Sequence, residues 1–413
     1  MDLTLNLSAV PSEPFAIAFS GGGDSTALLH ALREFSPLAL IVDHGLRAGS
    51  AEEARKAKYF AVSLGLKAQI LTWRAPPLKT GIQAKARLAR YDLLGQACRR
   101  RSLKYLLTGH TEDDQAETVL MRLKAGGSWR GAAGMRPLTV SPVWPQLASV
   151  TLCRPMLSAS RSHIRAYLKH HNLPYADDPS NENRHFARIR ARDALQRAPL
   201  LRREMLELSR DMSLGRERER QLFAEQVRRT VSGDIFGNLY LTSVPVPYLL
   251  GHILRAVSGT AARARGGELR RLTAAMTSPD FRGASLGGAV VSQYKQGWIV
   301  MRDPVMAFGR SDVTPLAEQP ISGRTLWDGR FWMDGERTLA PAGKTWGQAP
   351  EPLAVALKAC PAPARAALPV WRANGKVLAI GPIGRDGQRL ASVRSAILPR
   401  LQHEVEAASI EPK

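Results

Sequence analysis

The stretch Ser20-Gly21-Gly22-Gly23-Asp24-Ser25 lies directly after the apolar run PFAIAF and directly before a helical pattern that begins near Thr26. Glycines at such a turn let the backbone approach a ligand, and the free N–H groups of the first helical turn can then converge on an anion. The pattern therefore predicts a phosphate-binding loop between a strand and a helix. A purely structural strand-to-helix turn is the alternative reading of the glycines.

On both sides of this loop, short apolar runs alternate with helical patterns. We predict strands at 15–19, 38–42, 67–73 and 104–108, and helices at 25–35, 51–64 and 83–101. Helices that connect successive strands in this way place the strands parallel and cover both faces of the sheet. The fold class is therefore α/β, a doubly wound parallel sheet, followed by two smaller C-terminal domains.

The loop departs from the common nucleotide-binding motifs in its charge. Asp24 stands where the Walker A motif has a lysine, and the glycine spacing is not GxGxxG. A carboxylate would repel a phosphate unless a cation lay between them. We therefore expect Asp24 to hold Mg²⁺ between its side chain and the phosphates of the ligand.

A second acidic segment follows the predicted strand at 104–108. His110 lies two residues after this strand, and Asp113, Asp114 and Glu117 lie in the next two helical turns. Thr111 and Asp114 have the spacing of a capping box, which explains one acid structurally. Asp114 and Glu117 lie three residues apart on one helical face, which favours a site for a cationic group.

The sequence resembles two nested families. The loop at 20–25 is similar to the SGGxDS loop of the N-type ATP pyrophosphatases, or PP-loop enzymes, which split ATP between its α- and β-phosphates. The stretches SGGGDS, VDHGLR, GHTEDDQAETVLMRL and ADDPSNENRHFARIRAR together resemble the tRNA(Ile)-lysidine synthetases. Members of that family activate C2 of the wobble cytidine, position 34 of a CAU-anticodon isoleucine tRNA, with ATP. The side-chain amine of L-lysine then attacks to give lysidine, AMP and pyrophosphate.

The resemblance implies roles for particular residues. Asp24 matches the acid that holds Mg²⁺, Arg90 matches an arginine near the reaction centre, and Asp114 with Glu117 match acids that bind lysine. The ATP-binding positions are Ser20, Gly21, Gly22, Gly23, Asp24, Ser25 and His110. Three basic positions are expected to contact tRNA or phosphate: Arg188, Arg190 and Arg192. The asparagine that the family usually has within this basic segment is absent.

Composition agrees with a nucleic-acid partner. The 58 Lys and Arg residues outnumber the 36 Asp and Glu residues, which gives a net charge of +22 over 413 residues. Such an excess favours a polyanion, although it also keeps proteins soluble. We expect a cytoplasmic enzyme with no membrane segment and no obligate protein partner.

The chain divides by pattern into three parts. We predict a catalytic domain at 1–205, a tRNA-binding domain of mixed structure at 206–314 and a small tRNA-binding domain at 315–413. A long charged helix is expected at 199–231, and hairpins are expected to turn at Gly297 and at Asn374-Gly375. The glycine-rich stretch at 124–146 interrupts regular structure and is either a lid or a disordered loop.

Three other functions are compatible with parts of this pattern. A PP-loop tRNA thiolase would need paired cysteines, but Cys98, Cys153 and Cys360 are far apart in the sequence. A PP-loop synthetase of small-molecule metabolism has no use for such a basic charge. An inactive RNA-binding protein would not need Asp24.

Overall fold

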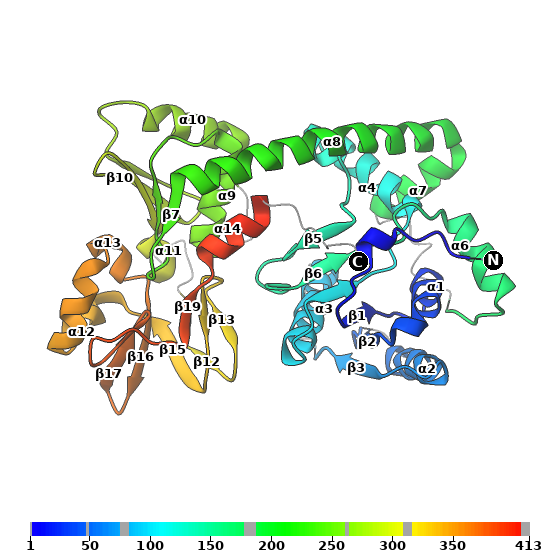
Figure 1. The fold of residues 1–413 in the computed structure, drawn as a ribbon, viewed down its shortest axis with the longest axis horizontal. Helices are drawn as coiled ribbons and strands as arrows, with labels where there is room; N and C mark the ends of the chain where they lie inside the picture. The colour runs from blue at the N-terminus through cyan, green and yellow to red at the C-terminus, as the bar shows by residue number, and fades with distance from the viewer. Residues whose placement is uncertain are drawn as a thin grey trace. The chain divides into compact units, whose positions relative to one another are not determined.

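The computed structural model describes residues 2–46, 49–74, 82–176, 187–260, 264–308 and 316–405. The chain forms two compact units, of which the first extends to Arg220 and the second begins at Gln221 (Figure 1). Arg47 of VDHGLR and residues 177–186 of the basic stretch lie outside the described residues.

The first unit is built on one sheet with the strand order β3-β2-β1-β4-β6-β5 (Figure 1). Adjacent strands are parallel except β5, which runs antiparallel to β6 at the edge. The predicted α/β fold and its four strands are confirmed. The strands are β1 (Phe15–Ala18), β2 (Leu38–Asp43), β3 (Ala68–Thr72), β4 (Tyr105–Leu107), β5 (Leu138–Val140) and β6 (Thr151–Cys153).

Helices cover both faces of this sheet. Side chains alternate along β1, so Ile17 packs into one core with Leu28 of α1, while Ala16 packs into another with Leu94 of α3. Because both faces are apolar, the strands have almost no polar side. The helices of this unit are α1 (Gly23–Ala31), α2 (Ser50–Ser63), α3 (Ile82–Arg100), α4 (Glu112–Lys124), α5 (Trp129–Ala132), α6 (Arg161–His170) and α7 (Ala187–Arg197).

The glycine-rich stretch at 124–146 was predicted to interrupt regular structure, and the structure shows otherwise. It contains the short helix α5 and the edge strand β5, so it is not devoid of regular structure. Arg122 donates to the carbonyl oxygens of Gly131 and Gly134, which fixes this stretch against α4. Its glycines serve turns, as at Gly134 with a φ of 62°.

The predicted long charged helix is confirmed as α8 (Pro199–Thr230). The boundary expected near residue 206 falls inside α8, and the two compact units divide further along this helix, after Arg220. The three-domain plan of the sequence stays a prediction.

The second unit contains antiparallel sheets with short helices. Its hairpin between β10 and β11 turns at Lys295 and Gln296, not at Gly297, because Gly297 already pairs with Tyr294 in the ladder. The hairpin at Asn374-Gly375 joins β16 and β17 as predicted. The sheets have the orders β7-β8-β11-β10-β9, β12-β15-β16-β17-β18 and β13-β14-β19.

The strands of the second unit are β7 (Val231–Gly233), β8 (Leu239–Leu241), β9 (Gly283–Leu286), β10 (Ala289–Tyr294), β11 (Gly297–Arg302), β12 (Gln319–Ile321), β13 (Thr325–Trp327), β14 (Phe331–Met333), β15 (Arg337–Pro341), β16 (Pro369–Ala373), β17 (Lys376–Ile380), β18 (Ile383–Gly384) and β19 (Val393–Ser395). Its α-helices are α9 (Pro247–Ser258), α10 (Gly266–Met276), α11 (Pro304–Phe308), α12 (Glu351–Ala356), α13 (Ala362–Arg365) and α14 (Ile397–Val405).

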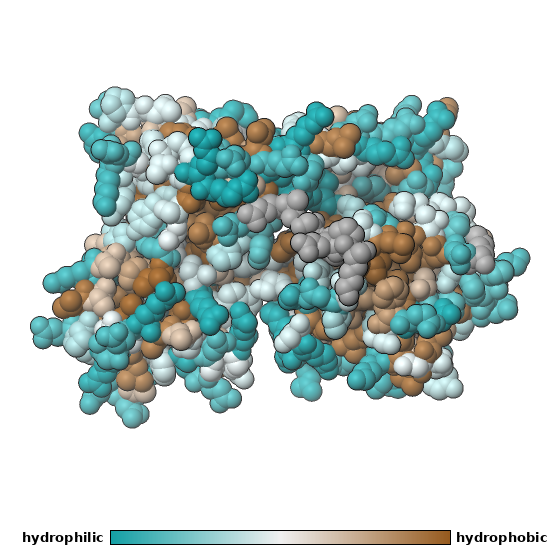
Figure 2. Space-filling model, in the orientation of Figure 1, coloured by the Kyte–Doolittle hydropathy of each residue, from teal (hydrophilic) through white to brown (hydrophobic). Residues whose placement is uncertain are grey.

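Hydrophilic residues predominate on the face of each unit that Figure 2 displays, and hydrophobic residues form smaller patches between them. Among the helices of the described ranges, none combines the length and the apolar character that a bilayer crossing requires.

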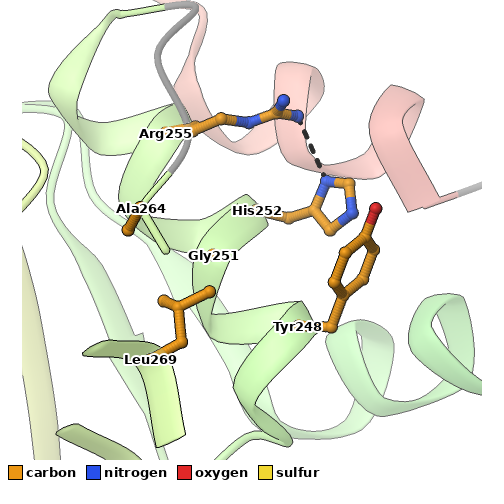
Figure 3. A pocket seen from close by; sticks show the side chains of 6 residues that line it. All are labelled: Tyr248, Gly251, His252, Arg255, Ala264 and Leu269. Carbon is orange, nitrogen blue, oxygen red and sulfur yellow. Dashed lines mark hydrogen bonds between the residues drawn. The ribbon is translucent and has the colours of Figure 1, made fainter. Parts of the chain in front are cut away.

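A small cavity lies in the second unit beside α9 (Figure 3). His252 at its edge is 2.7 Å from the buried Glu404 carboxylate of α14. The cavity measures about 40 Å³, whereas sites for drug-sized ligands measure about 300–1,000 Å³. It is therefore a packing defect of this unit, with room for about two or three water molecules.

Candidate active site

The loop after β1 has the geometry of an anion site. Gly21 has a φ of 80°, a conformation that other residues rarely adopt, and α1 begins at Gly23 without a side-chain cap. The Ser25 hydroxyl donates to the Gly22 carbonyl oxygen at 2.9 Å and accepts from the Ser20 backbone N–H at 3.2 Å. These bonds hold the loop in shape, and within the described ranges no side chain caps the first N–H groups of α1, which suit an anion.

The carboxyl end of β4 meets this loop closely. A Cβ atom at Gly109 would lie 3.0 Å from the carbonyl carbon and oxygen of Asp24 and 3.1 Å from the Ser25 nitrogen. Only glycine fits there without displacement of the backbone. This contact brings His110 and the acidic start of α4 next to the phosphate loop, at the edge where open α/β sheets bind ligands.

Asp24 lies in the first turn of α1 and is partly buried. Burial and the neighbouring charge of Asp114 raise the pKa of its carboxyl to about 6. Within the described part of the chain, no hydrogen bond or ion pair holds this carboxylate. An unpaired carboxylate beside an open helix N-terminus fits a cation that also binds phosphate.

The same site has few other protein ligands for a metal. The described ranges contain no group of three or more His, Cys, Asp or Glu side chains that could hold an ion. A cation at Asp24 would therefore take most of its ligands from phosphate oxygens and water, as Mg²⁺ does in nucleotide sites.

The raised pKa of Asp24 predicts a pH-dependent effect on stability. The folded-state pKa of about 6 exceeds the ordinary value of 3.8, so the ionised carboxylate destabilises the free protein. This penalty is absent below the ordinary pKa and develops as the pH rises through the folded value. We expect Asp24→Asn to raise the melting temperature of the ligand-free protein at about pH 8 and to change it little at about pH 4. Thermal unfolding scans at both pH values test this, and equal shifts would contradict it.

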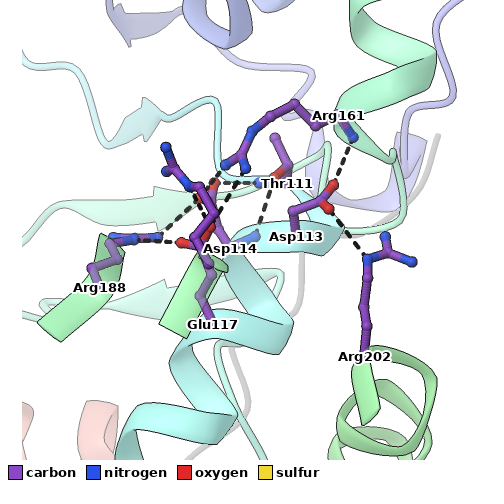
Figure 4. Close-up of polar contacts among 8 residues, drawn as sticks. Thr111, Asp113, Asp114, Glu117, Arg161, Arg188 and Arg202 are labelled. Atoms are coloured by element: carbon purple, nitrogen blue, oxygen red, sulfur yellow. Dashed lines mark hydrogen bonds and ion pairs between the residues drawn. The ribbon is translucent and has the colours of Figure 1, made fainter. Parts of the chain in front are cut away.

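The acidic residues of α4 contact two different parts of the protein, the start of their own helix and α8; Figure 4 shows Asp113 and Asp114 among them. Asp114 and Thr111 make the predicted capping box, with the Asp114 carboxylate 2.9 Å from the Thr111 backbone nitrogen. Glu112 and Asp113 face α8, where Arg202 contacts them at 2.6 and 3.2 Å. Asp114 therefore caps α4 as predicted, and the cap uses only one of its two carboxylate oxygens.

The other contacts of Asp114 and Glu117 are with arginines (Figure 4). Arg188 contacts Asp114 at 3.0 Å and Glu117 at 2.8 Å. Arg192 contacts Glu117 at 2.9 Å, and Arg161 contacts both acids at 3.2 and 3.4 Å. Glu117 is almost fully buried, with a side-chain exposure of 2%. We call these two acids and three arginines the acid–arginine cluster.

This cluster changes the interpretation of the basic segment. Arg188 and Arg192, expected to contact tRNA or phosphate, face the acids of α4 in this structure. Arg190, the third member of the set, is exposed on α7. Sequence reasoning missed Arg161, although its place at the start of the helix after β6, at the ligand-binding edge, was a signal.

His110 lies in the loop after β4, and Arg90 of α3 contacts His44, which directly follows β2. His110 shares a hydrogen bond of 2.8 Å with the Thr108 hydroxyl, and burial together with nearby arginines lowers its pKa to about 3. Arg90 donates to Nε2 of His44 at 2.8 and 3.2 Å, and burial together with Arg90 lowers the His44 pKa to about 4. Both histidines are therefore neutral at physiological pH. The partnership of His44 with Arg90 was not predicted.

Comparison with known proteins agrees with this geometry. A family model described as a PP-loop domain matches residues 3–198. A tRNA(Ile)-lysidine synthase of Hyphomonas neptunium is 36% identical, over 69% of this chain and 82% of that protein. One from Zymomonas mobilis is 34% identical, over 64% of this chain and 82% of that protein. One from Ruegeria pomeroyi is 32% identical, over 85% of this chain and 86% of that protein.

Proposed function

Because the chain belongs to the tRNA(Ile)-lysidine synthase family, and is thus an ATP-dependent ligase that acts on tRNA, we propose the following reaction. The enzyme adenylates the C2 oxygen of cytidine 34 in an isoleucine tRNA with a CAU anticodon. The side-chain amine of L-lysine then displaces AMP. The products are lysidine, AMP and pyrophosphate, formed in the cytoplasm.

The phosphate loop carries the first step. The open N–H groups at the start of α1 bind the ATP phosphates, and Asp24 holds the Mg²⁺ that neutralises them. Mg²⁺ held by Asp24 would stabilise the negative charge that develops on pyrophosphate as it leaves. The observation that carries the proposal is the Asp24 carboxylate, which no described residue pairs with, at an uncapped helix start where the charge of Asp114 raises its pKa.

The second step needs an amine held close to the adenylated base. Asp114 and Glu117 lie on the element next to the phosphate loop, and they are the acids that bind an ammonium group of the incoming lysine. Positioning of this kind converts attack into an intramolecular event, which is worth several kcal/mol. Both acids are already paired with arginines in this structure, so lysine must exchange for part of these contacts.

The rival reading as a tRNA thiolase has little chemical support. Cys98, Cys153 and Cys360 are all buried, and burial raises the pKa of each thiol to about 12. A sulfur carrier needs an accessible thiolate. The three cysteines instead pack as small apolar side chains.

One experiment tests substrate, cofactor and partner together. The protein is incubated with ATP, Mg²⁺, labelled lysine and total tRNA, and label is sought in the tRNA. We expect incorporation that requires ATP and stops when the isoleucine tRNA with the CAU anticodon is removed. Absence of label from the tRNA, or incorporation that does not depend on the CAU-anticodon isoleucine tRNA, would reject the proposal.

The basic charge predicts a strong salt dependence of tRNA binding. Each phosphate that the protein neutralises releases counterions, so the logarithm of affinity should fall with the logarithm of salt by about 0.7 to 0.9 per contact. The net charge of +22 leads us to expect several such contacts. Filter binding across a range of salt concentrations measures the slope, and ATP binding in the same buffers is the control. A slope near zero would contradict the expectation.

A further inference from the structure

Arg165 lies on α6, one helical turn beyond Arg161, and its side chain is exposed. Its guanidinium Nη1 donates to the Tyr175 hydroxyl at 3.4 Å. Within the described ranges, no acidic side chain forms an ion pair with it. Among these residues, the positive charge of Arg165 therefore has no carboxylate to neutralise it.

Tyr175, the partner of Arg165, lies beside the phosphate loop. A Cβ atom at Gly23, the first residue of α1, would be 3.4 Å from Cδ2 of the Tyr175 ring. The next residue, Ala176, donates its backbone N–H to the Gly21 carbonyl oxygen at 2.9 Å and forms a short parallel bridge with the loop. The segment after α6 thus runs alongside the phosphate loop and brings to it the hydroxyl that Arg165 contacts.

The charge of Arg165 also acts on the phosphate loop directly. Burial and Asp114 raise the pKa of the Asp24 carboxyl, and Arg165 is among the arginines that act in the opposite direction. No hydrogen bond or ion pair joins Asp24 to Arg165, so the effect is one of proximity alone. Phosphates that bind this loop would therefore meet the charge of Arg165 as well.

The first step of the proposed reaction places new negative charge at this position. The C2 oxygen of the cytidine forms a bond to the α-phosphorus of ATP. The bond from that phosphorus to the bridging oxygen breaks, and its electron pair stays on the pyrophosphate. A guanidinium suits such a group, because it binds phosphate oxygens through two parallel hydrogen bonds.

Resting on the proposed function, we propose that Arg165 binds the β- and γ-phosphates of ATP and the pyrophosphate that leaves. Tyr175 holds the guanidinium beside the phosphate loop. The loop itself has Asp24 where the Walker A motif has a lysine, so it lacks a basic side chain for the phosphates. Arg165 supplies that positive charge from a separate helix.

The test compares the binding of inorganic pyrophosphate with that of AMP, both in the presence of Mg²⁺. Arg165→Gln should weaken pyrophosphate binding roughly tenfold and leave AMP binding unchanged. This factor is the lower end of the range for a hydrogen bond to a charged group, because the side chain is exposed. Single-turnover release of pyrophosphate from ATP with tRNA should slow by a similar factor.

Two further variants and one control refine the test. Arg165→Lys keeps the charge but not the paired geometry and should give a smaller loss. Tyr175→Phe keeps the ring against α1 and removes only the hydroxyl, so it should weaken pyrophosphate binding about threefold. Lys169→Gln removes one positive charge from an exposed position one turn further along α6 and should change none of these quantities.

The proposal fails if Arg165→Gln binds pyrophosphate as wild type does, if it loses pyrophosphate and AMP binding alike, or if only tRNA affinity falls. Because Arg165 is exposed, the melting temperature of this variant should equal that of wild type. Release of pyrophosphate by the wild-type enzyme is measured in parallel, with ATP and tRNA but without lysine. Its absence would reject the proposed function, whereas an unchanged Arg165→Gln rejects only the role of Arg165.

Discussion

Asp24→Ala should abolish release of pyrophosphate from ATP in the presence of tRNA while tRNA binding stays nearly intact. The carboxylate lies in the first turn of α1, where nothing in the described chain pairs with it, so its charge is available to Mg²⁺. Loss of a metal that stabilises charge on a phosphate is worth several kcal/mol, or about 10² to 10⁴ in rate. We expect an effect at the upper end of this range.

Pyrophosphate release and tRNA affinity should be measured on the same preparation at several Mg²⁺ concentrations. Glu52→Ala, which removes an exposed acid from α2 of the same unit, is the control and should behave as wild type. Pyrophosphate release by Asp24→Ala at the wild-type rate in Mg²⁺ would show that the assigned role is wrong. A parallel loss of tRNA affinity would indicate a general folding defect.

Glu117→Gln should reduce lysine transfer roughly ten- to a hundredfold and leave adenylation of the tRNA largely intact. Glu117 is the most buried acid of the acid–arginine cluster, and it contacts Arg161, Arg188 and Arg192. Its neutralisation also leaves buried positive charge without compensation, which costs about 3–5 kcal/mol when a buried pair is broken. We therefore expect a lower melting temperature as well.

A fall in stability alone does not distinguish a binding role from a structural one. The decisive quantity is the ratio of the lysine step to the adenylation step, measured by single turnover well below the melting temperature. Asp113→Asn is the matched control, since this acid lies in the same helix but contacts Arg202 and the backbone of Arg161. If Glu117→Gln impairs both steps alike, the acid is structural and the lysine-binding role fails.

Much of the fold could be predicted from the sequence, because the patterns that indicate strands and helices lie within short stretches of the chain. Strands buried on both faces are continuous apolar runs, and the helices between them have their own periodicity. The phosphate loop was also predictable, because three glycines and Asp24 lie within six residues. The capping box of Thr111 and Asp114 needs only a spacing of three residues. The turn at Gly297 was misplaced by one or two residues, because register depends on the partner strand.

The contacts that give the site its chemistry were decided only by the tertiary structure. Arg161 is 44 residues from Glu117 in the sequence, and Arg192 is 75 residues from it, so no local pattern pairs them. The effect of Asp114 on the pKa of Asp24 depends on the close passage of Gly109 over the phosphate loop. Sequence determines which charges exist, because each residue carries its own. Which charges meet, and which remain available to a ligand, depends on how distant strands and helices pack, since a buried charge is stable only beside the partner that the fold supplies.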